Sequence, residues 1–285
     1  MNVWLTDFWA CDFLRNAVWG ILLVSVSCGL TGGYIVKRRM AFLGDAMAHG
    51  VLPGVALAWM AGVSLFWGGL AAGFVMALLI GWIAAGDKIR EDAAIGVVFT
   101  SLFAGGVVLM SGQNSYRDFQ HLLLGNILGV TEADLCWLAL SAVAVAGVLF
   151  AFHKELELTT YDPEYAETLG ISPTLMRMLL LGVLAFAVVS AIQAVGVVLT
   201  GAMLVTPALT AGLLSRRFYV ALIAAPAIGA ASGLCGLVIS YFWDLPSGAM
   251  MVLCGTAFFV ATRLFRAWRE KGGSVSDTAN KGEMR

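Results

Sequence analysis

Long apolar stretches alternate with short polar ones along the 285 residues of the chain. A window of about 20 apolar residues is long enough to cross the hydrocarbon core of a bilayer as a helix. Nine such windows occur, with eight as the alternative count, at residues 16–36, 41–62, 66–86, 92–111, 133–152, 173–193, 195–214, 219–241 and 246–266. The pattern predicts an all-α fold, a polytopic transmembrane helical bundle.

Two of these windows explain why the count is open. The window at 41–62 contains Pro53 together with two ionisable residues, and proline removes a backbone hydrogen bond from a helix interior, so we expect a broken or partly re-entrant helix there. The window at 195–214 follows the preceding one after Gln193 to Gly196, which leaves room only for a tight reversal.

Composition supports a membrane protein. Hydrophobic residues make up 60% of the chain and charged residues 12%, whereas about half of an ordinary globular domain is apolar. The formal net charge of −1 gives no indication of a nucleic-acid partner. The five cysteines are widely separated, so neither a disulfide framework nor a thiolate metal cluster is predicted.

We expect one transmembrane domain over residues 16–270, flanked by two short segments. Residues 1–15 are rich in aromatic side chains, which is typical of a segment lying in the membrane interface. Residues 271–285 are polar and predict a disordered cytoplasmic tail. Small residues recur four apart within the domain, a pattern that lets helix backbones pack closely in lipid. The pairs are Gly29/Gly33, Gly69/Gly73 and Gly229/Gly233.

Basic residues indicate an orientation. If the loop after the first span is cytoplasmic, fifteen of the 17 basic residues fall on the cytoplasmic side and only Arg15 and Arg117 fall outside. Cytoplasmic loops carry an excess of Lys and Arg, so this distribution predicts an N-terminus outside and a C-terminus in the cytoplasm.

Asp45 and His49 form the most informative pair in the sequence, within GDAMAHGVLPG. Ionisable groups inside a membrane cost several kcal/mol each and usually have a function. A spacing of four residues places both side chains on one helical face, where a carboxylate oxygen and a neutral imidazole nitrogen can bind one divalent transition-metal ion. The alternative is a buried hydrogen-bonded pair that only stabilises the fold.

A polar loop between the fifth and sixth windows contains a complete short helix at about 162–170. Asp162 suits the N-cap, Pro163 the first helical position and Glu164 the first turn, while Gly170 can end the helix in a left-handed conformation. Such a rigid helix across the cytoplasmic face would let a soluble motor move the membrane domain. The alternative is a solvated connector that happens to be helical.

Hydroxyl groups and a proline mark the window at 195–214. A proline kink there could expose a backbone carbonyl to a pathway, although threonine also commonly bonds back to its own helix. The candidate pathway-lining residues are Thr200, Thr206, Pro207 and Thr210.

Several segments together resemble the membrane permeases of bacterial ABC importers for zinc, manganese or iron. They include RRMAFLGDAMAHGVLPGVALAW, YDPEYAETLGIS and VGVVLTGAMLVTPALTAGLL, and they extend from about residue 38 to residue 253. The resemblance implies a type II importer in the bacterial inner membrane, with two copies of this permease, cytoplasmic ATPase subunits and an extracytoplasmic metal-binding protein. It implies that Asp45 and His49 coordinate the transported metal. It also implies a coupling helix that docks into the ATPase through Asp162, Pro163, Glu164, Tyr165, Ala166, Leu169 and Gly170.

The chain contains no G-x-x-x-x-G-K-[ST] phosphate loop, so ATP hydrolysis is expected in a separate subunit, and this chain is expected to be no enzyme and to hold no permanent cofactor. A second hypothesis is a proton-coupled secondary transporter, in which Asp45 and His49 relay protons. A third is a membrane metalloenzyme, which would need about three protein ligands and a general base; no H-E-x-x-H motif is present.

Overall fold

The computed structural model describes residues 11–84, 90–111, 127–215 and 217–282, with side chains to Arg269. Within these ranges every regular element is helical, as predicted. Eight helices are long and apolar enough to cross a membrane. They are α2 (Asp12–Lys37), α5 (Leu65–Ile83), α6 (Glu91–Ser111), α8 (Glu132–Ala151), α11 (Pro173–Val195), α12 (Val197–Leu214), α13 (Phe218–Trp243) and α14 (Ser247–Gly282), whose apolar part is Ser247–Arg269.

The window at 41–62 is the broken helix that the sequence predicts. It consists of α3 (Phe42–Gly50) and α4 (Leu52–Ala61), which meet at Val51, and Pro53 lies in the first turn of α4. Because Pro53 has no N–H group, the carbonyl of His49 loses its usual i+4 donor. The described chain therefore has eight long spans and one divided span.

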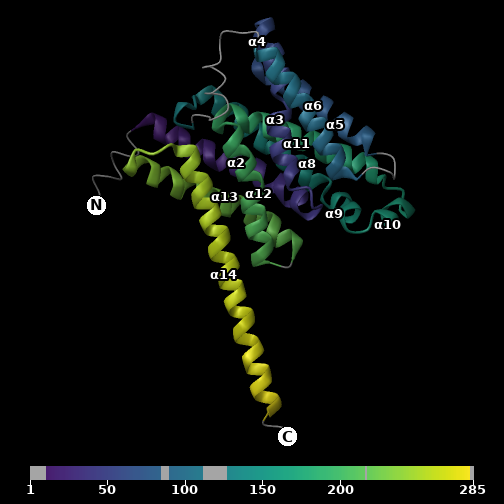
Figure 1. Cartoon of the computed structure of the whole chain (residues 1–285), viewed down its shortest axis with the longest axis vertical. Coiled ribbons are helices and arrows are strands. Elements are labelled where there is room, and N and C mark those ends of the chain that lie inside the picture. Colours follow the sequence, from purple (N-terminus) through teal and green to yellow (C-terminus); the bar gives the residue numbers. More distant parts are fainter. Residues whose placement is uncertain (1–10, 85–89, 112–126, 216, 283–285) are drawn as a thin grey trace.

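Three short elements complete the described part. A 3-10 turn, η1 (Ile127–Gly129), precedes α8, and α9 (His153–Tyr161) and α10 (Pro163–Thr168) lie between α8 and α11. Figure 1 shows α9 and α10 together beside the ends of the long helices.

The bundle is built around α2 and α11. In each of them 67% of the spanning window is buried, against 11% in α14. Close backbone approach makes this packing possible: a Cβ on Gly29 of α2 would lie 2.7 Å from the backbone nitrogen of Pro226 in α13. Small residues thus bring helices together as predicted, where van der Waals contact replaces a hydrophobic driving force.

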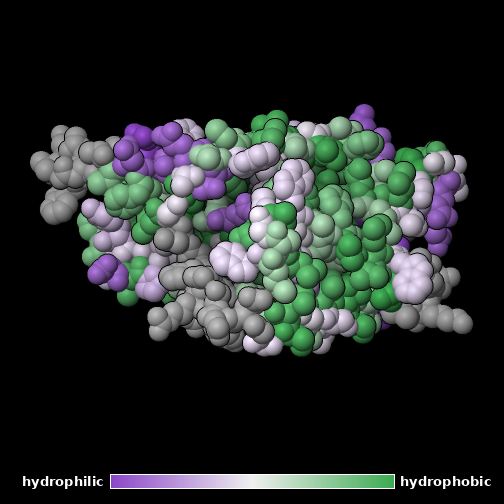
Figure 2. All heavy atoms as spheres, turned by 90° about the horizontal axis from the view of Figure 1, so that it is seen from above, coloured by the Kyte–Doolittle hydropathy of each residue, from purple (hydrophilic) through white to green (hydrophobic). Residues whose placement is uncertain are grey.

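Many large apolar side chains are exposed on the outer surface. Figure 2 shows hydrophobic residues across the middle of the face in view and hydrophilic residues toward its ends. A surface of this kind suits hydrocarbon as a solvent, since helices satisfy their own backbone hydrogen bonds.

The structure describes little of the N-terminal segment and the backbone of most of the C-terminal one. Residues 1–10, most of the predicted interfacial segment, lie outside the described residues, and α2 begins at Asp12. At the other end the backbone of α14 continues as helix to Gly282 and projects away from the bundle, in the segment for which composition predicts disorder (Figure 1). A polar helix that projects alone is held only by its own hydrogen bonds, so the disorder of this tail stays a prediction.

Candidate metal site

The first half of the divided span positions Asp45 and His49. The chain leaves α2, turns through Arg39 in a left-handed conformation (φ 62°) and enters α3 with Ala41 as its N-cap. Within α3 the four-residue spacing puts the two side chains on neighbouring positions of one face. Asp45 Oδ1 lies 3.7 Å from His49 Nε2.

This distance is longer than a direct hydrogen bond and close to the spacing of two ligand atoms on one metal ion. An N–H···O hydrogen bond needs about 2.7–3.2 Å between heavy atoms, so the two groups are not hydrogen-bonded. Two ligand atoms that each lie about 2.1 Å from a tetrahedral metal ion are about 3.4 Å apart. A small side-chain rotation would therefore let both atoms bind one ion.

The two side chains differ in environment. The Asp45 side chain is 50% exposed and the His49 side chain 24% exposed. The imidazole packs against α6, with ring centroids 5.7 Å from Phe103 and 6.3 Å from Phe99. The carboxylate is thus accessible to an ion, while the rings of Phe99 and Phe103 restrict the orientation of the imidazole.

One atom of His49 lacks a partner. Its Nδ1 is buried and has no hydrogen-bond partner among the described residues. Buried polar atoms without partners are uncommon in folded proteins. The imidazole is therefore held by ring packing, and its orientation leaves Nε2 toward Asp45.

A third helix, α12, closes one side of the pair. A Cβ placed on Gly201 would lie 3.3 Å from Asp45 Oδ1, so the backbone of α12 passes close to the carboxylate. No local pattern in the sequence singles out Gly201, because its position beside Asp45 depends on how α12 packs against α3. Among the described residues no group of three or more His, Cys, Asp or Glu side chains could hold a metal ion, and Asp45 and His49 stand as a pair.

The hydroxyl groups of α12 mostly bond within their own helix. Thr200 Oγ1 donates to the carbonyl of Gly196 (2.7 Å) and Thr210 Oγ1 to that of Thr206 (2.8 Å). Both threonines are buried. Both threonines therefore bond back to carbonyls one turn earlier, which is the alternative to lining a pathway.

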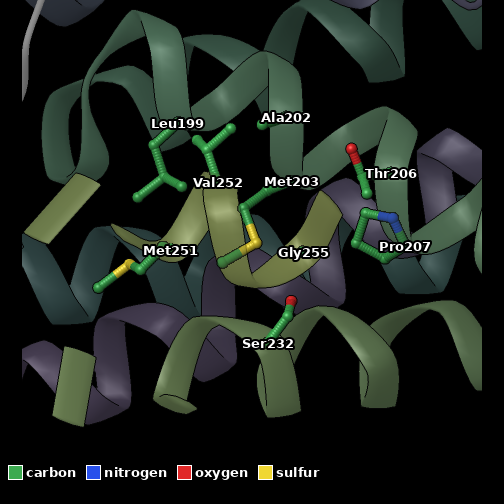
Figure 3. A pocket seen from close by; sticks show the side chains of 9 residues that line it. All are labelled: Leu199, Ala202, Met203, Thr206, Pro207, Ser232, Met251, Val252 and Gly255. Carbon is green, nitrogen blue, oxygen red and sulfur yellow. The ribbon is translucent and has the colours of Figure 1, made fainter. Parts of the chain in front are cut away.

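Thr206 and Pro207 line a small cavity of about 10 Å³ between α12, α13 and α14, which has room for about one water molecule (Figure 3). Thr206 follows Gly201 by five residues, a rotation of about 140° around the helix. It therefore faces away from Asp45 within one chain, and a pathway role for these α12 residues stays a prediction.

The predicted short helix has the predicted caps. Asp162 Oδ1 accepts a hydrogen bond from the backbone N–H of Tyr165 (2.9 Å), Pro163 occupies the first turn, and Gly170 has a positive φ of 79°. Ala166 is buried, whereas Tyr165 and Leu169 are exposed. The helix α10 thus presents an aromatic and an aliphatic side chain outward.

The sequence did not predict how this region is attached to the bundle. Arg38, directly after α2, donates from Nε to Thr160 Oγ1 (3.0 Å) and from Nη2 to Thr159 Oγ1 (3.1 Å), both on α9. Burial lowers the pKa of the Arg38 guanidinium, and the nearby Glu91 carboxylate opposes that shift. The partners of Arg38 lie more than 120 residues away, so no local pattern could have indicated them.

An ion pair lies next to these hydrogen bonds. Arg177 Nη1 of α11 and Glu91 Oε1 of α6 are 2.8 Å apart. Arg38, Glu91 and Arg177 border a cavity of about 300 Å³ that Pro163 of α10 also lines. The ends of α2, α6, α9 and α11 therefore meet through polar side chains beside α10.

A bundle of membrane-spanning helices with an accessible ionisable pair in a divided span defines a polytopic membrane transport protein. The family model of the ABC 3 transport family matches residues 10–266. The chain belongs to this family, and it is the membrane permease of an ATP-binding cassette transporter, as the sequence predicts.

Individual relatives cover nearly the whole chain. It is 39% identical over 270 residues to the manganese transport system membrane protein MntC of Halalkalibacterium halodurans, with 91% of this chain and 92% of that protein covered. It is 36% identical over 257 residues to a protein of Haemophilus influenzae named as a probable iron transport system membrane protein, with 90% and 95% covered.

A solved structure has the same fold. A chain in the structure of PsaBC from Streptococcus pneumoniae in complex with Fab matches with a TM-score of 0.82 at 33% identity, and the match covers 92% of this chain and 95% of that one.

Proposed function

We propose that this chain is the permease of an ATP-driven importer for a divalent transition-metal ion, manganese, iron or zinc. Asp45 and His49 bind the ion transiently during alternating access. The observation that carries the proposal is the 3.7 Å separation of Asp45 Oδ1 and His49 Nε2, too long for a hydrogen bond and close to the spacing of two ligands on one ion. The names of the relatives, which include manganese and iron transport proteins, support the same cargo.

Incomplete coordination suits transport. A transported ion must be bound strongly enough to enter and weakly enough to leave. Two protein ligands do not complete the shell of a tetrahedral or octahedral ion, so water or a second copy of the permease supplies the rest. The half-exposed carboxylate of Asp45 leaves room for such additional ligands.

Energy enters from a separate ATPase subunit at the cytoplasmic face, and an extracytoplasmic binding protein delivers the ion to two copies of the permease. The capped helix α10 is the coupling helix, and exposed Tyr165 and Leu169 are the side chains suited to bind the ATPase. The excess of basic residues at the α10 end of the bundle supports a cytoplasmic location for that end and for the C-terminus.

Metal uptake by the complete transporter in proteoliposomes tests the ligand assignment. Because each substitution removes one of two ligands, Asp45→Asn and His49→Gln are expected to lower ATP-dependent uptake at least about tenfold, with normal amounts of assembled complex. Asp92→Asn, which removes an exposed carboxylate at the start of α6, is the matched control and should transport normally.

Near-normal uptake by both site variants would remove the ligand assignment. Uptake that persists without ATP and collapses with the proton gradient would instead establish the proton-coupled carrier.

A further inference from the structure

A second polar cavity lies on another side of α2, away from the metal pair. Its volume is about 500 Å³, and it is formed where the ends of α2, α12 and α13 meet α14. Lys37 and Arg39 come from the end of α2 and the turn after it, and Arg266 comes from the last turns of the apolar part of α14. We call this cavity the basic cleft.

The charged side chains that line the basic cleft are all positive. None of the described residues that line it is acidic, while three are basic. The Lys37 ammonium lies 4.7 Å from the ring centroid of Tyr161, a cation–π contact that positions the charge without neutralising it. Arg266 Nη1 donates to the backbone carbonyl of Leu213 (3.1 Å), which orients the guanidinium at the wall of the cleft.

The remaining walls are mostly apolar. Ala208 on α12 and Phe218 and Leu222 on α13 face the same cavity as the basic side chains. A site with positive charge at one end and apolar walls suits an amphipathic anion. The basic side chains can pair with its charged group and the walls can contact its apolar part, whereas a free inorganic anion would use the basic side chains alone.

The position of the cleft indicates where such a ligand comes from. Lys37 is the last residue of one membrane span, Arg39 lies two residues beyond it, and Arg266 lies three residues before the end of another span. All three therefore lie at the level where the bilayer changes from hydrocarbon to headgroups. The bordering helix α14 has only 11% of its spanning window buried, so most of its surface is exposed at the outside of this chain. Basic pockets between membrane helices at this level are typical sites for anionic lipid headgroups.

We propose that the basic cleft binds the phosphate group of an anionic phospholipid, such as phosphatidylglycerol or cardiolipin, with the acyl chains along α13 and α14. Lys37, Arg39 and Arg266 pair with the phosphate oxygens. The bound lipid fills the space between α14 and the rest of the bundle. This inference is independent of metal transport, because it rests on a different cavity.

Native mass spectrometry of the purified permease, released from nanodiscs that contain phosphatidylglycerol and phosphatidylcholine in equal amounts, tests the proposal. Phosphatidylglycerol should be retained preferentially, and the double variant Lys37→Gln/Arg266→Gln should retain it about thirtyfold less, since each of the two basic side chains near the headgroups contributes about 1 kcal/mol. Arg266→Lys keeps the charge and should retain the lipid. It therefore separates loss of charge from loss of folding.

Matched controls remove the same charge outside the cleft. Arg263→Gln lies on the same helix one turn earlier and Lys154→Gln lies on α9; both side chains are exposed, and the double control should bind lipid like the unchanged protein. Equal retention by the cleft and control variants would overturn the proposal, and so would equal binding of phosphatidylcholine. Displacement of the lipid by inorganic phosphate at millimolar concentration would show a phosphate site in place of a lipid site.

Discussion

At the residue scale, Gly201 determines how near α12 comes to the carboxylate of Asp45. A Cβ at this position would lie 3.3 Å from Oδ1, tighter than an ordinary van der Waals contact. The placement of Asp45 and His49 on one helical face could be predicted from the sequence, since it depends only on helical periodicity. The close approach of Gly201 and the rings of Phe99 and Phe103 could not, because they depend on which faces of separate helices meet.

Substitution of Gly201 tests this approach. Gly201→Ala requires a movement of a few tenths of an ångström, which the half-exposed Asp45 side chain can make, so metal uptake should fall only modestly. Gly201→Val directs branched methyl groups at the carboxylate and should lower uptake about tenfold or more, with normal expression. Gly147→Val, at a position with open space around its Cβ, is the control for valine in a helix. Equal uptake by the two Gly201 variants would contradict the steric explanation.

At the element scale, the connection between α2 and α9 links the regions of the two proposed functional sites, which are the Asp45/His49 pair and α10. Arg38 holds α9, which leads directly into α10, and only Arg39, Met40 and Ala41 separate Arg38 from α3. The boundaries of α10 followed from its caps in the sequence, and the break in the divided span followed from Pro53. The Arg38 contacts with Thr159 and Thr160 did not, because they are long-range.

Loss of the Arg38 contacts is expected to uncouple ATP hydrolysis from transport. Arg38→Gln removes the forked donor that binds two threonines at once, and Arg38→Lys cannot replace it because a single ammonium lacks that fork. Both variants should transport several-fold less metal per ATP hydrolysed, with ATPase activity of the assembled complex retained. Lys154→Gln, an exposed charge on α9, should leave the ratio unchanged. An unchanged ratio in both Arg38 variants would show that this contact only stabilises the fold.

At the scale of the whole molecule, the positions of the spans could be predicted from the sequence because a bilayer requires long apolar helices. Each span needs an apolar window of sufficient length, so the positions of the eight long helices could be predicted to within a few residues. The central place of α2 and α11 could not, because lipid-facing and buried apolar side chains are alike in hydropathy. The peripheral place of α14 could not be predicted for the same reason: its apolar residues are mostly exposed in this fold, and the same sequence could equally have been buried.

The peripheral place of α14 has a consequence for biogenesis. This helix follows the other described spans along the chain and packs chiefly against α12 and α13, so those spans can complete their mutual packing before it arrives. A chain divided in the turn at Leu245–Pro246 and co-expressed as two fragments should therefore reassemble in the membrane. Co-purification of the fragments and restored metal uptake measure this reassembly. Two fragments that are each degraded would show that α14 must be joined covalently for the bundle to mature.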